Sequence, residues 1–141
     1  MKVKAYAKIN LALKVLGKRN DGFHNLEMIM VNVGIYDILK FKKNKDVSVL
    51  TDKPVCKMED NIVYKAAKLI KEKMDIKKGI EIFIKKNIPV AAGMAGGSSN
   101  AAAVLVGLNE LWKLGLSKDE LRDLGLKLGA DVPFCIEGGT A

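Results

Sequence analysis

The stretch from Pro89 to Asn100 constrains the fold more than any other part of the chain, because it places three glycines among small residues. Before this stretch, Ile80, Ile82 and Ile84 alternate with other residues, which is typical of a strand. After it, apolar residues recur at helical spacing, namely Ala101, Leu105, Leu108 and Trp112. The stretch is therefore predicted to be a strand-to-helix turn in which few side chains block access to the backbone.

The helix after this turn is expected to start near Ser98, Ser99 and Asn100, which are residue types that suit an N-cap. Unpaired amides at a helix N-terminus, the helix dipole and glycines together bind anions, and phosphate is a common example. A Walker A loop is excluded because Gly97 is followed by Ser98 and not by lysine, and Gly93 lacks the spacing of a dinucleotide fingerprint. A flexible surface loop is the alternative, since glycine-rich turns are common.

The composition indicates one globular domain. The chain has 141 residues, 49% of them hydrophobic and 28% charged, and a chain of this size buries about 70% of its unfolded surface. The two cysteines are far apart, which favours a reducing cytoplasm, and no apolar run reaches the ~18 residues of a membrane span. The net charge of +8 comes mostly from scattered lysines, which are typical of a solvated surface and also attract anionic substrates.

Residues 2–15 alternate between apolar and polar side chains, which predicts a long, half-buried strand that is broken or bent. This alternation places Lys8 and Asn10 on one face of the strand, about 7 Å apart. A turn over residues 17–22 leads to Phe23 and to His24, the only histidine. Judged by residue type alone, Lys8 is an exposed lysine and His24 is a structural hydrogen-bonding residue.

The rest of the chain alternates between strand and helix patterns. Further strands are expected at 26–33, 36–42 and 47–50. Asp60 is expected to cap an amphipathic helix whose apolar stripe runs from Ile62 to Met74. A second capped helix is expected to begin at the capping box 117–120 and to end at Gly129.

Asp131 is expected to lie at a sharp corner of the backbone. Pro133 disfavours a helical conformation of Val132, so the chain is predicted to turn there and to continue as a strand. A turn or capping role for this aspartate is the alternative. The elements together predict an α+β fold, with helices packed on a mixed β-sheet.

Four separated motifs resemble those of the GHMP kinases, which are small-molecule kinases of galactose, homoserine, mevalonate and phosphomevalonate type. The motifs are Ala-Lys-Ile-Asn at 7–10, Arg-Asn-Asp-Gly-Phe-His at 19–24, the glycine stretch ending in Gly-Gly-Ser-Ser-Asn-Ala-Ala, and Gly-Ala-Asp-Val-Pro-Phe at 129–134. They occur in the order of the family and span most of the chain. The resemblance implies that residues 1–141 form an N-terminal GHMP domain with a fold like that of ribosomal protein S5 domain 2.

Family members continue into a second domain that forms the other wall of the active-site cleft. The resemblance therefore implies that this chain is a fragment and that it is inactive alone. Within the family, the motifs most resemble those of the branch that phosphorylates a cytidyl-diphosphate sugar alcohol. That branch belongs to the non-mevalonate route to isoprenoid precursors.

The resemblance also implies roles for five residues. Lys8 would sit at the reacting hydroxyl, Asp131 would be the catalytic base, and Asn10 would orient the substrate. Phe23 and His24 would hold the cytosine ring. The family usually has tyrosine at the position of Phe23, so this chain retains stacking and lacks a contact through a phenol.

ATP and Mg²⁺ are the implied cofactors. The phosphates would lie on the backbone of the glycine stretch, and the start of the helix near residue 61 would line the adenine pocket. Ser98 or Ser99 would help to place Mg²⁺. The expected nucleotide-binding residues are Asn61, Pro89, Val90, Ala91, Ala92, Gly93, Met94, Ala95, Gly96, Gly97, Ser98 and Ser99.

Two other functions stay open at this point. A mevalonate- or homoserine-type GHMP kinase would phosphorylate a substrate without a cytidyl group. An RNA-binding domain would fit the basic charge, because related folds occur in ribosomal proteins, although the pair Lys8 and Asp131 argues against it. The expected partners are ATP and a small-molecule substrate, without nucleic acid or membrane, and the sequence does not define an oligomeric state.

Overall fold

The computed structural model describes the backbone of residues 1–18, 24–53, 57–88 and 96–137, with side chains for these residues except 9–18, 24–32 and Gly96. Within these ranges, one sheet has four strands in the order β1-β2-β4-β3. The strands are β1 (Lys2–Lys18), β2 (His24–Asn44), β3 (Val47–Thr51) and β4 (Gly79–Lys85). The β3–β4 pair is parallel and the other pairs are antiparallel, so the sheet is mixed as predicted.

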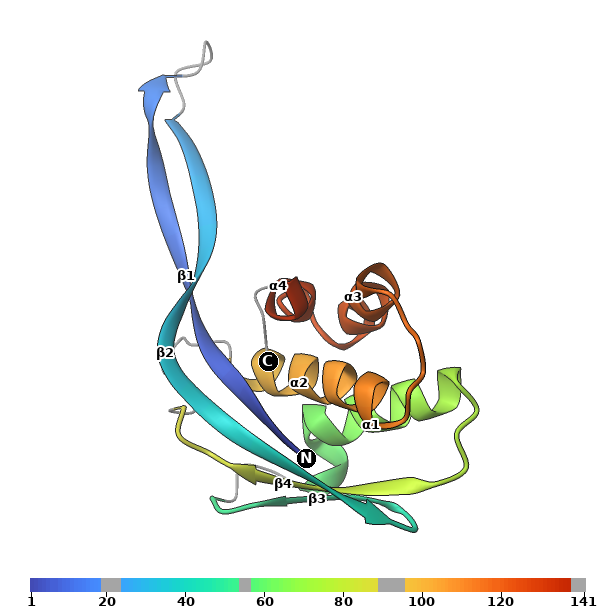
Figure 1. Cartoon of the computed structure of the whole chain (residues 1–141). Coiled ribbons are helices and arrows are strands. Elements are labelled where there is room, and N and C mark those ends of the chain that lie inside the picture. The colour runs from blue at the N-terminus through green and yellow to red at the C-terminus, as the bar shows by residue number, and fades with distance from the viewer. Residues whose placement is uncertain (19–23, 54–56, 89–95, 138–141) are drawn as a thin grey trace.

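The helices form two layers over the sheet. They are α1 (Ile62–Lys73), α2 (Gly96–Leu111), α3 (Lys118–Leu128) and α4 (Val132–Glu137), and a short 3-10 helix, η1 (Met58–Asp60), precedes α1. Figure 1 shows α1 and α2 on one face of the sheet, with α3 and α4 beyond α2 on the side away from the sheet. The predicted α+β fold is confirmed. None of the helices in the described ranges is long and apolar enough to cross a membrane.

Strands β1 and β2 form a long hairpin whose outer part extends beyond the helices (Figure 1). Its register shifts between Lys14 and Lys18 and also between Tyr6 and Lys8, where Tyr6 is opposite Tyr36 and Lys8 is opposite Asn32. The extra residues of β2 include Gly34, whose φ of +79° suits glycine. This β-bulge confirms the predicted bend in the first strand. It also corrects the prediction of two separate strands at 26–33 and 36–42, because the chain continues through the bulge as one strand.

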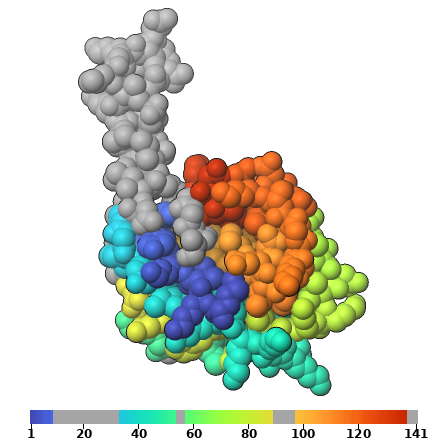
Figure 2. Space-filling model, viewed as in Figure 1, coloured from blue at the N-terminus to red at the C-terminus, as the bar shows by residue number. Residues whose placement is uncertain are grey.

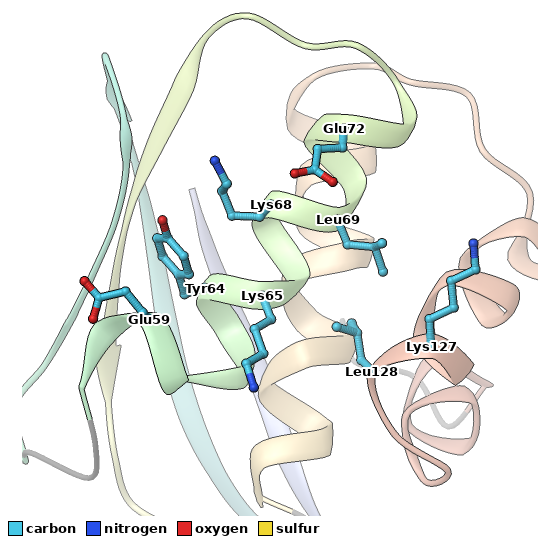
Figure 3. Close-up of a pocket in the computed structure, with 8 residues that line it drawn as sticks. All are labelled: Glu59, Tyr64, Lys65, Lys68, Leu69, Glu72, Lys127 and Leu128. Atoms are coloured by element: carbon cyan, nitrogen blue, oxygen red, sulfur yellow. The ribbon is translucent and has the colours of Figure 1, made fainter.

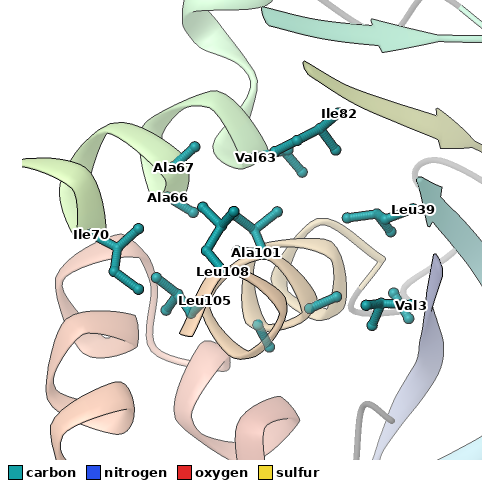
Figure 4. Packing of buried hydrophobic residues seen from close by; sticks show 14 of the residues in the cluster. Val3, Leu39, Val63, Ala66, Ala67, Ile70, Ile82, Ala101, Leu105 and Leu108 are labelled. Carbon is teal, nitrogen blue, oxygen red and sulfur yellow. The ribbon is translucent and has the colours of Figure 1, made fainter. Parts of the chain in front are cut away.

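The core lies between the sheet and the first helical layer and continues between the two helical layers, where Leu121, Leu124, Val132, Cys135 and Ile136 belong to the same buried cluster. Figure 4 shows Val63 and Ile70 of α1 packed with Leu105 and Leu108 of α2, and Val3, Leu39 and Ile82 of the sheet on the other side of the cluster. Helix α2 is rich in alanine and approaches the sheet closely, because a Cβ at Gly107 would lie only 2.9 Å from Cζ of Phe41. At the other end of α2, the Ser99 hydroxyl donates to the Tyr6 carbonyl and so places the start of the helix against β1.

The helix ends differ in part from the sequence predictions. The N-cap of α1 is Asn61 and not Asp60, because the Asn61 side chain accepts a hydrogen bond from the Val63 amide and Asp60 ends η1. Helix α2 begins at Gly96, two residues earlier than expected. The predicted capping box of α3 at 117–120 is confirmed, and the helix ends before Gly129 as expected.

The predicted strand after Pro133 is wrong, because residues Val132–Glu137 form the helix α4. Proline is tolerated in the first turn of a helix, where its missing N–H has no intrahelical partner and its fixed φ is suitable. The Cys135 amide donates to the Asp131 carbonyl at 3.2 Å and so closes the first turn around Pro133. This arrangement outweighs the restriction that proline places on Val132. Asp131 therefore directly precedes a helix and not a strand.

Candidate functional site

The starts of α1 and α2 lie side by side. A Cβ at Gly97 would lie 3.6 Å from Cγ2 of Ile62, which is an ordinary van der Waals contact. Asn61 Oδ1 accepts the Val63 amide at 2.9 Å and so fixes the first turn of α1. Two helix N-termini, each with a partial positive charge, thus meet beside the segment predicted to bind phosphate. The structure brings together Asn61 and the start of α2, which the sequence assigned to one nucleotide pocket.

The hydroxyl of Ser99 connects α2 to β1 and α4. It is fully buried, donates to the Tyr6 carbonyl at 2.5 Å and lies 3.5 Å from Sγ of Cys135. Tyr6 is two residues before Lys8, and Cys135 is four residues after Asp131. Ser99 therefore holds in contact the three elements that carry the predicted phosphate and catalytic residues. The neighbouring Ser98 is only half-buried.

Lys8 and Asp131 both act electrostatically on the buried thiol of Cys135. Burial raises the pKa of this thiol, the hydrogen bond with Ser99 and the charge of Lys8 lower it, and the charge of Asp131 raises it. Lys8 itself is only 4% exposed, although Lys2 and Lys4 on the same strand are exposed. The predicted catalytic lysine and aspartate are therefore neighbours of the same buried group.

The raised pKa of Cys135 leads to a prediction about alkaline stability. The thiol of an unfolded chain ionises around its ordinary pKa of 9.0, while the native thiol stays protonated to higher pH, so the native state binds more protons above that value. The free energy of unfolding should therefore fall as the pH rises above 9.0. In a Cys56→Ser background, urea denaturation at several pH values should show this fall, and Cys135→Ala should weaken it. An identical pH dependence with and without Cys135 would contradict the prediction.

Asn100 is a candidate site residue that the sequence assigned only to capping. It is 3% exposed, and its Oδ1 has no hydrogen-bond partner among the described residues. A buried acceptor without a partner is costly. In the sequence, the signal for a buried polar side chain at this position was an asparagine directly before the run of alanines at 101–103.

Several predicted site residues lie outside the described parts of the chain. Phe23 is among them, and so are the first residues of the glycine stretch, which are Pro89, Val90, Ala91, Ala92, Gly93, Met94 and Ala95. Only the backbone is described for Asn10, which pairs with Met30, and for His24, which pairs with Lys18. The predicted roles of all these residues stay predictions.

A hollow of about 360 Å³ lies elsewhere, on the outer side of α1 and next to α3 (Figure 3). It is lined by Glu59, Tyr64, Lys65, Lys68, Leu69, Glu72, Lys127 and Leu128. None of these residues was predicted to bind substrate or nucleotide. The hollow is therefore separate from the candidate site around Ser99.

The chain is similar to known proteins over its whole length. The family model described as the GHMP kinases N terminal domain matches residues 61–139. The chain is 62% identical to the 4-diphosphocytidyl-2-C-methyl-D-erythritol kinase of Clostridioides difficile (strain 630), covering 100% of this chain and 49% of that protein. It is 54% identical to the enzyme of the same name from Alkaliphilus metalliredigens (strain QYMF), covering 100% of this chain and 50% of that protein. The chain thus spans about half the length of these curated relatives.

Solved structures show the same similarity. A crystal structure of 4-(cytidine 5'-diphospho)-2C-methyl-D-erythritol kinase aligns with a TM-score of 0.76 and 36% identity, over 98% of this chain and 49% of that one. A crystal structure of mevalonate kinase aligns with a TM-score of 0.67 over 100% of this chain and 48% of that one, but with only 16% identity. The second similarity therefore shows the fold alone.

Proposed function

Because this chain belongs to the GHMP kinases, we propose that it contributes to transfer of the γ-phosphoryl group of ATP to the 2-hydroxyl of 4-diphosphocytidyl-2-C-methyl-D-erythritol. The observation that carries the proposal is the 62% identity, over the whole chain, to a relative named as the kinase of that compound. A mevalonate- or homoserine-type activity has weaker support, since the mevalonate kinase structure is only 16% identical. The proposal includes the non-mevalonate pathway and the cytoplasmic location expected from the sequence.

The proposed chemistry depends mainly on positioning and on charge. Phosphoryl transfer requires an aligned hydroxyl and neutralisation of charge on the transferred group. In this proposal Asp131 accepts the proton of the hydroxyl and Lys8 stabilises the negative charge that develops. Both charges shift the pKa of Cys135, Lys8 downwards and Asp131 upwards, which supports a shared location. Asn10 orients the substrate, and Phe23 and His24 hold its cytosine ring.

The nucleotide is proposed to lie across the starts of α1 and α2. Residues 89–99 bind the phosphates, and Asn61 at the start of α1 lines the adenine pocket. The contact between Ile62 and the Gly97 position supports this arrangement, because it places the two helix starts next to each other. The Oδ1 of Asn100, which has no hydrogen-bond partner in the described parts of the chain, supplies a buried acceptor for a donor group of a ligand near the start of α2.

Mg²⁺ fits this proposal as an ion that binds together with ATP. Mg²⁺ usually keeps several waters and binds through substrate phosphates and one or two protein groups. This preference agrees with the described residues, which contain no cluster of three acidic, histidine or cysteine side chains suited to a metal. Of the two predicted serines, Ser98 is the better candidate, because it is only half-buried, whereas Ser99 is fully buried. When bound, Mg²⁺ neutralises part of the phosphate charge.

The proposal is tested with a chimaera in which this chain replaces the aligned half of the Clostridioides difficile relative. Phosphorylation by ATP and Mg²⁺ is measured with the cytidyl substrate, mevalonate and homoserine in parallel. The expected result is activity with the cytidyl substrate alone. Activity with mevalonate or homoserine would instead support another GHMP kinase function, and salt-dependent RNA binding without nucleotide binding would contradict the kinase proposal.

The role proposed for Phe23 gives a further prediction in the same chimaera. Phe23→Ala should raise KM for the cytidyl substrate through lost stacking, which is worth about 1–3 kcal/mol per base. KM for ATP should change little, and Phe23→Tyr should preserve the low KM for the cytidyl substrate. Steady-state kinetics with each substrate varied in turn provides the measurement. An equal rise in both KM values would place Phe23 in the nucleotide pocket or in the core.

A further inference from the structure

The carboxylate of Asp37 lies where β4 leaves the sheet. The β2–β4 ladder extends as far as the pair Ile38 and Lys85, so Asp37 occupies the next position along β2. Asp37 is fully buried. Residues 86–88 follow β4 and lead directly into Pro89, the first residue of the glycine stretch.

Asp37 contacts all three residues of this connecting segment. Nζ of Lys86 donates to Oδ2 at 2.6 Å, and the amides of Asn87 and Ile88 donate to Oδ1 at 2.5 Å and 2.8 Å. Asp52 adds a further contact by accepting the Lys86 amide at 2.8 Å. A single buried carboxylate thus fixes two backbone amides and one ammonium group directly before Pro89.

Ending a strand with a buried aspartate costs free energy, because the charged carboxylate loses its water. Removing a carboxylate and an ammonium group from water costs several kcal/mol per ion, and their attraction offsets this cost only with good geometry and further hydrogen bonds. Pro89 has no N–H and cannot continue a ladder. Charge-assisted bonds to the amides of Asn87 and Ile88 end the strand at a defined residue.

The two ends of the glycine stretch are attached to the same pair of residues in the hairpin. Before the stretch, Nδ2 of Asn87 donates to the Tyr36 carbonyl at 3.0 Å. After it, the Ser99 hydroxyl donates to the Tyr6 carbonyl at 2.5 Å. Tyr6 and Tyr36 are cross-strand partners whose rings contact edge to face, with centroids 5.3 Å apart. The position of Asp37 next to Tyr36 therefore links the entry of the stretch to its exit.

We propose that Asp37 is a positioning residue for nucleotide binding, in that its carboxylate fixes the point at which the chain enters the glycine stretch. This inference rests on the proposed function, because it takes the stretch as the phosphate site. The two amide contacts are the essential part, since they hold the backbone directly. The ion pair with Lys86 compensates the buried charge.

Two double variants of the 141-residue chain separate these contributions. Asp37→Asn with Lys86→Gln keeps an acceptor for the two amides and removes both charges. Asp37→Leu with Lys86→Met removes the acceptor and both charges, and apolar replacement of a buried ion pair is often tolerated. Neither variant leaves an unpaired buried charge. Urea denaturation at several temperatures identifies a temperature at which nearly all molecules of each variant are folded, and the binding measurements are made there.

ADP binding is measured by calorimetric titration, and hydrogen exchange at the amides of Asn87 and Ile88 is measured without nucleotide. We expect the Asn/Gln variant to keep slow exchange and an ADP Kd within about threefold of the parent chain. The Leu/Met variant should show fast exchange at both amides and a Kd at least about tenfold higher, a difference of ~1.4 kcal/mol or more.

Equal ADP affinity of the two variants, despite different exchange, would show that Asp37 only ends the strand and would overturn the inference. Slow exchange in the Leu/Met variant would also overturn it, because the amides would then be held by other groups. Failure of the parent chain to bind ADP would instead overturn the proposed function, before any variant is compared. The two failures are therefore distinguishable.

Discussion

Asp131→Asn is expected to lower the rate of phosphoryl transfer in the chimaera by about 10² or more, the scale of a lost general base. Lys8→Met should cause a loss of similar size, because the variant keeps the buried stem and removes the charge that stabilises the transition state. The double variant should be much less than multiplicatively slower, since residues that act as a unit are not additive. Single-turnover experiments with bound ATP measure the chemical step directly.

Matched control positions are available on β1 and on α3. Lys2→Ala removes an exposed lysine of β1, and Asp123→Asn removes an exposed aspartate of α3. Both should leave the single-turnover rate unchanged. A near-normal rate for Asp131→Asn would remove that residue from the role of base, and multiplicative losses in the double variant would show that Lys8 and Asp131 act separately.

Gly97→Val is expected to weaken ADP binding by the 141-residue chain at least about tenfold while preserving the fold. A side chain at this position points into space that the proposed phosphates would use. Within the described parts of the chain, an added Cβ would contact Cγ2 of Ile62 at 3.6 Å, which is an ordinary van der Waals distance, so we expect the fold to be preserved. Calorimetric titration and thermal denaturation of the same samples separate the loss of binding from any loss of folding.

Glu110→Val is a suitable control, because it places the same side chain at an exposed position in the last turn of α2. It should change ADP affinity little. Gly97→Ala should give an intermediate affinity, since it adds only the Cβ. If Gly97→Val binds ADP as tightly as the parent chain, the phosphates lie elsewhere and the start of α2 is not the site.

Local sequence patterns were sufficient to predict most of the elements. The capping box of α3 and the amphipathic stripe of α1 depend on residues three or four positions apart, so a single segment contains the whole signal. The helix α4 was missed, because Pro133 permits either a turn or a first helical turn. Packing against α2 and α3 favours the helix, and that packing cannot be seen in residues 131–137 alone.

The long-range contacts of the candidate site could not be predicted in the same way. The Ser99 hydroxyl and the Tyr6 carbonyl are 93 residues apart in the chain, and Asp37 and Lys86 are 49 apart. Serine and aspartate are common in turns and caps, so their local sequence favours a simpler role. The motif resemblance predicts that Lys8 and Asp131 share one site. The structure adds that Ser99 donates to the carbonyl of Tyr6, two residues before Lys8, and lies 3.5 Å from Sγ of Cys135, four residues after Asp131.

The bulge between Tyr6 and Lys8 changes the phase of side-chain alternation along β1. Val3, Ala5 and Ala7 face the core, and a regular strand would direct the next residue to solvent. Lys8 is buried as well, so two consecutive side chains are buried where the hairpin changes register. The side chain of Lys8 is thus buried, although Lys2 and Lys4 earlier on the same strand are exposed. The extra residues of the bulge lie in β2, so deleting one of them would reverse the facing of every later residue in β2, and alignments of this segment therefore need to conserve its length as strictly as its composition.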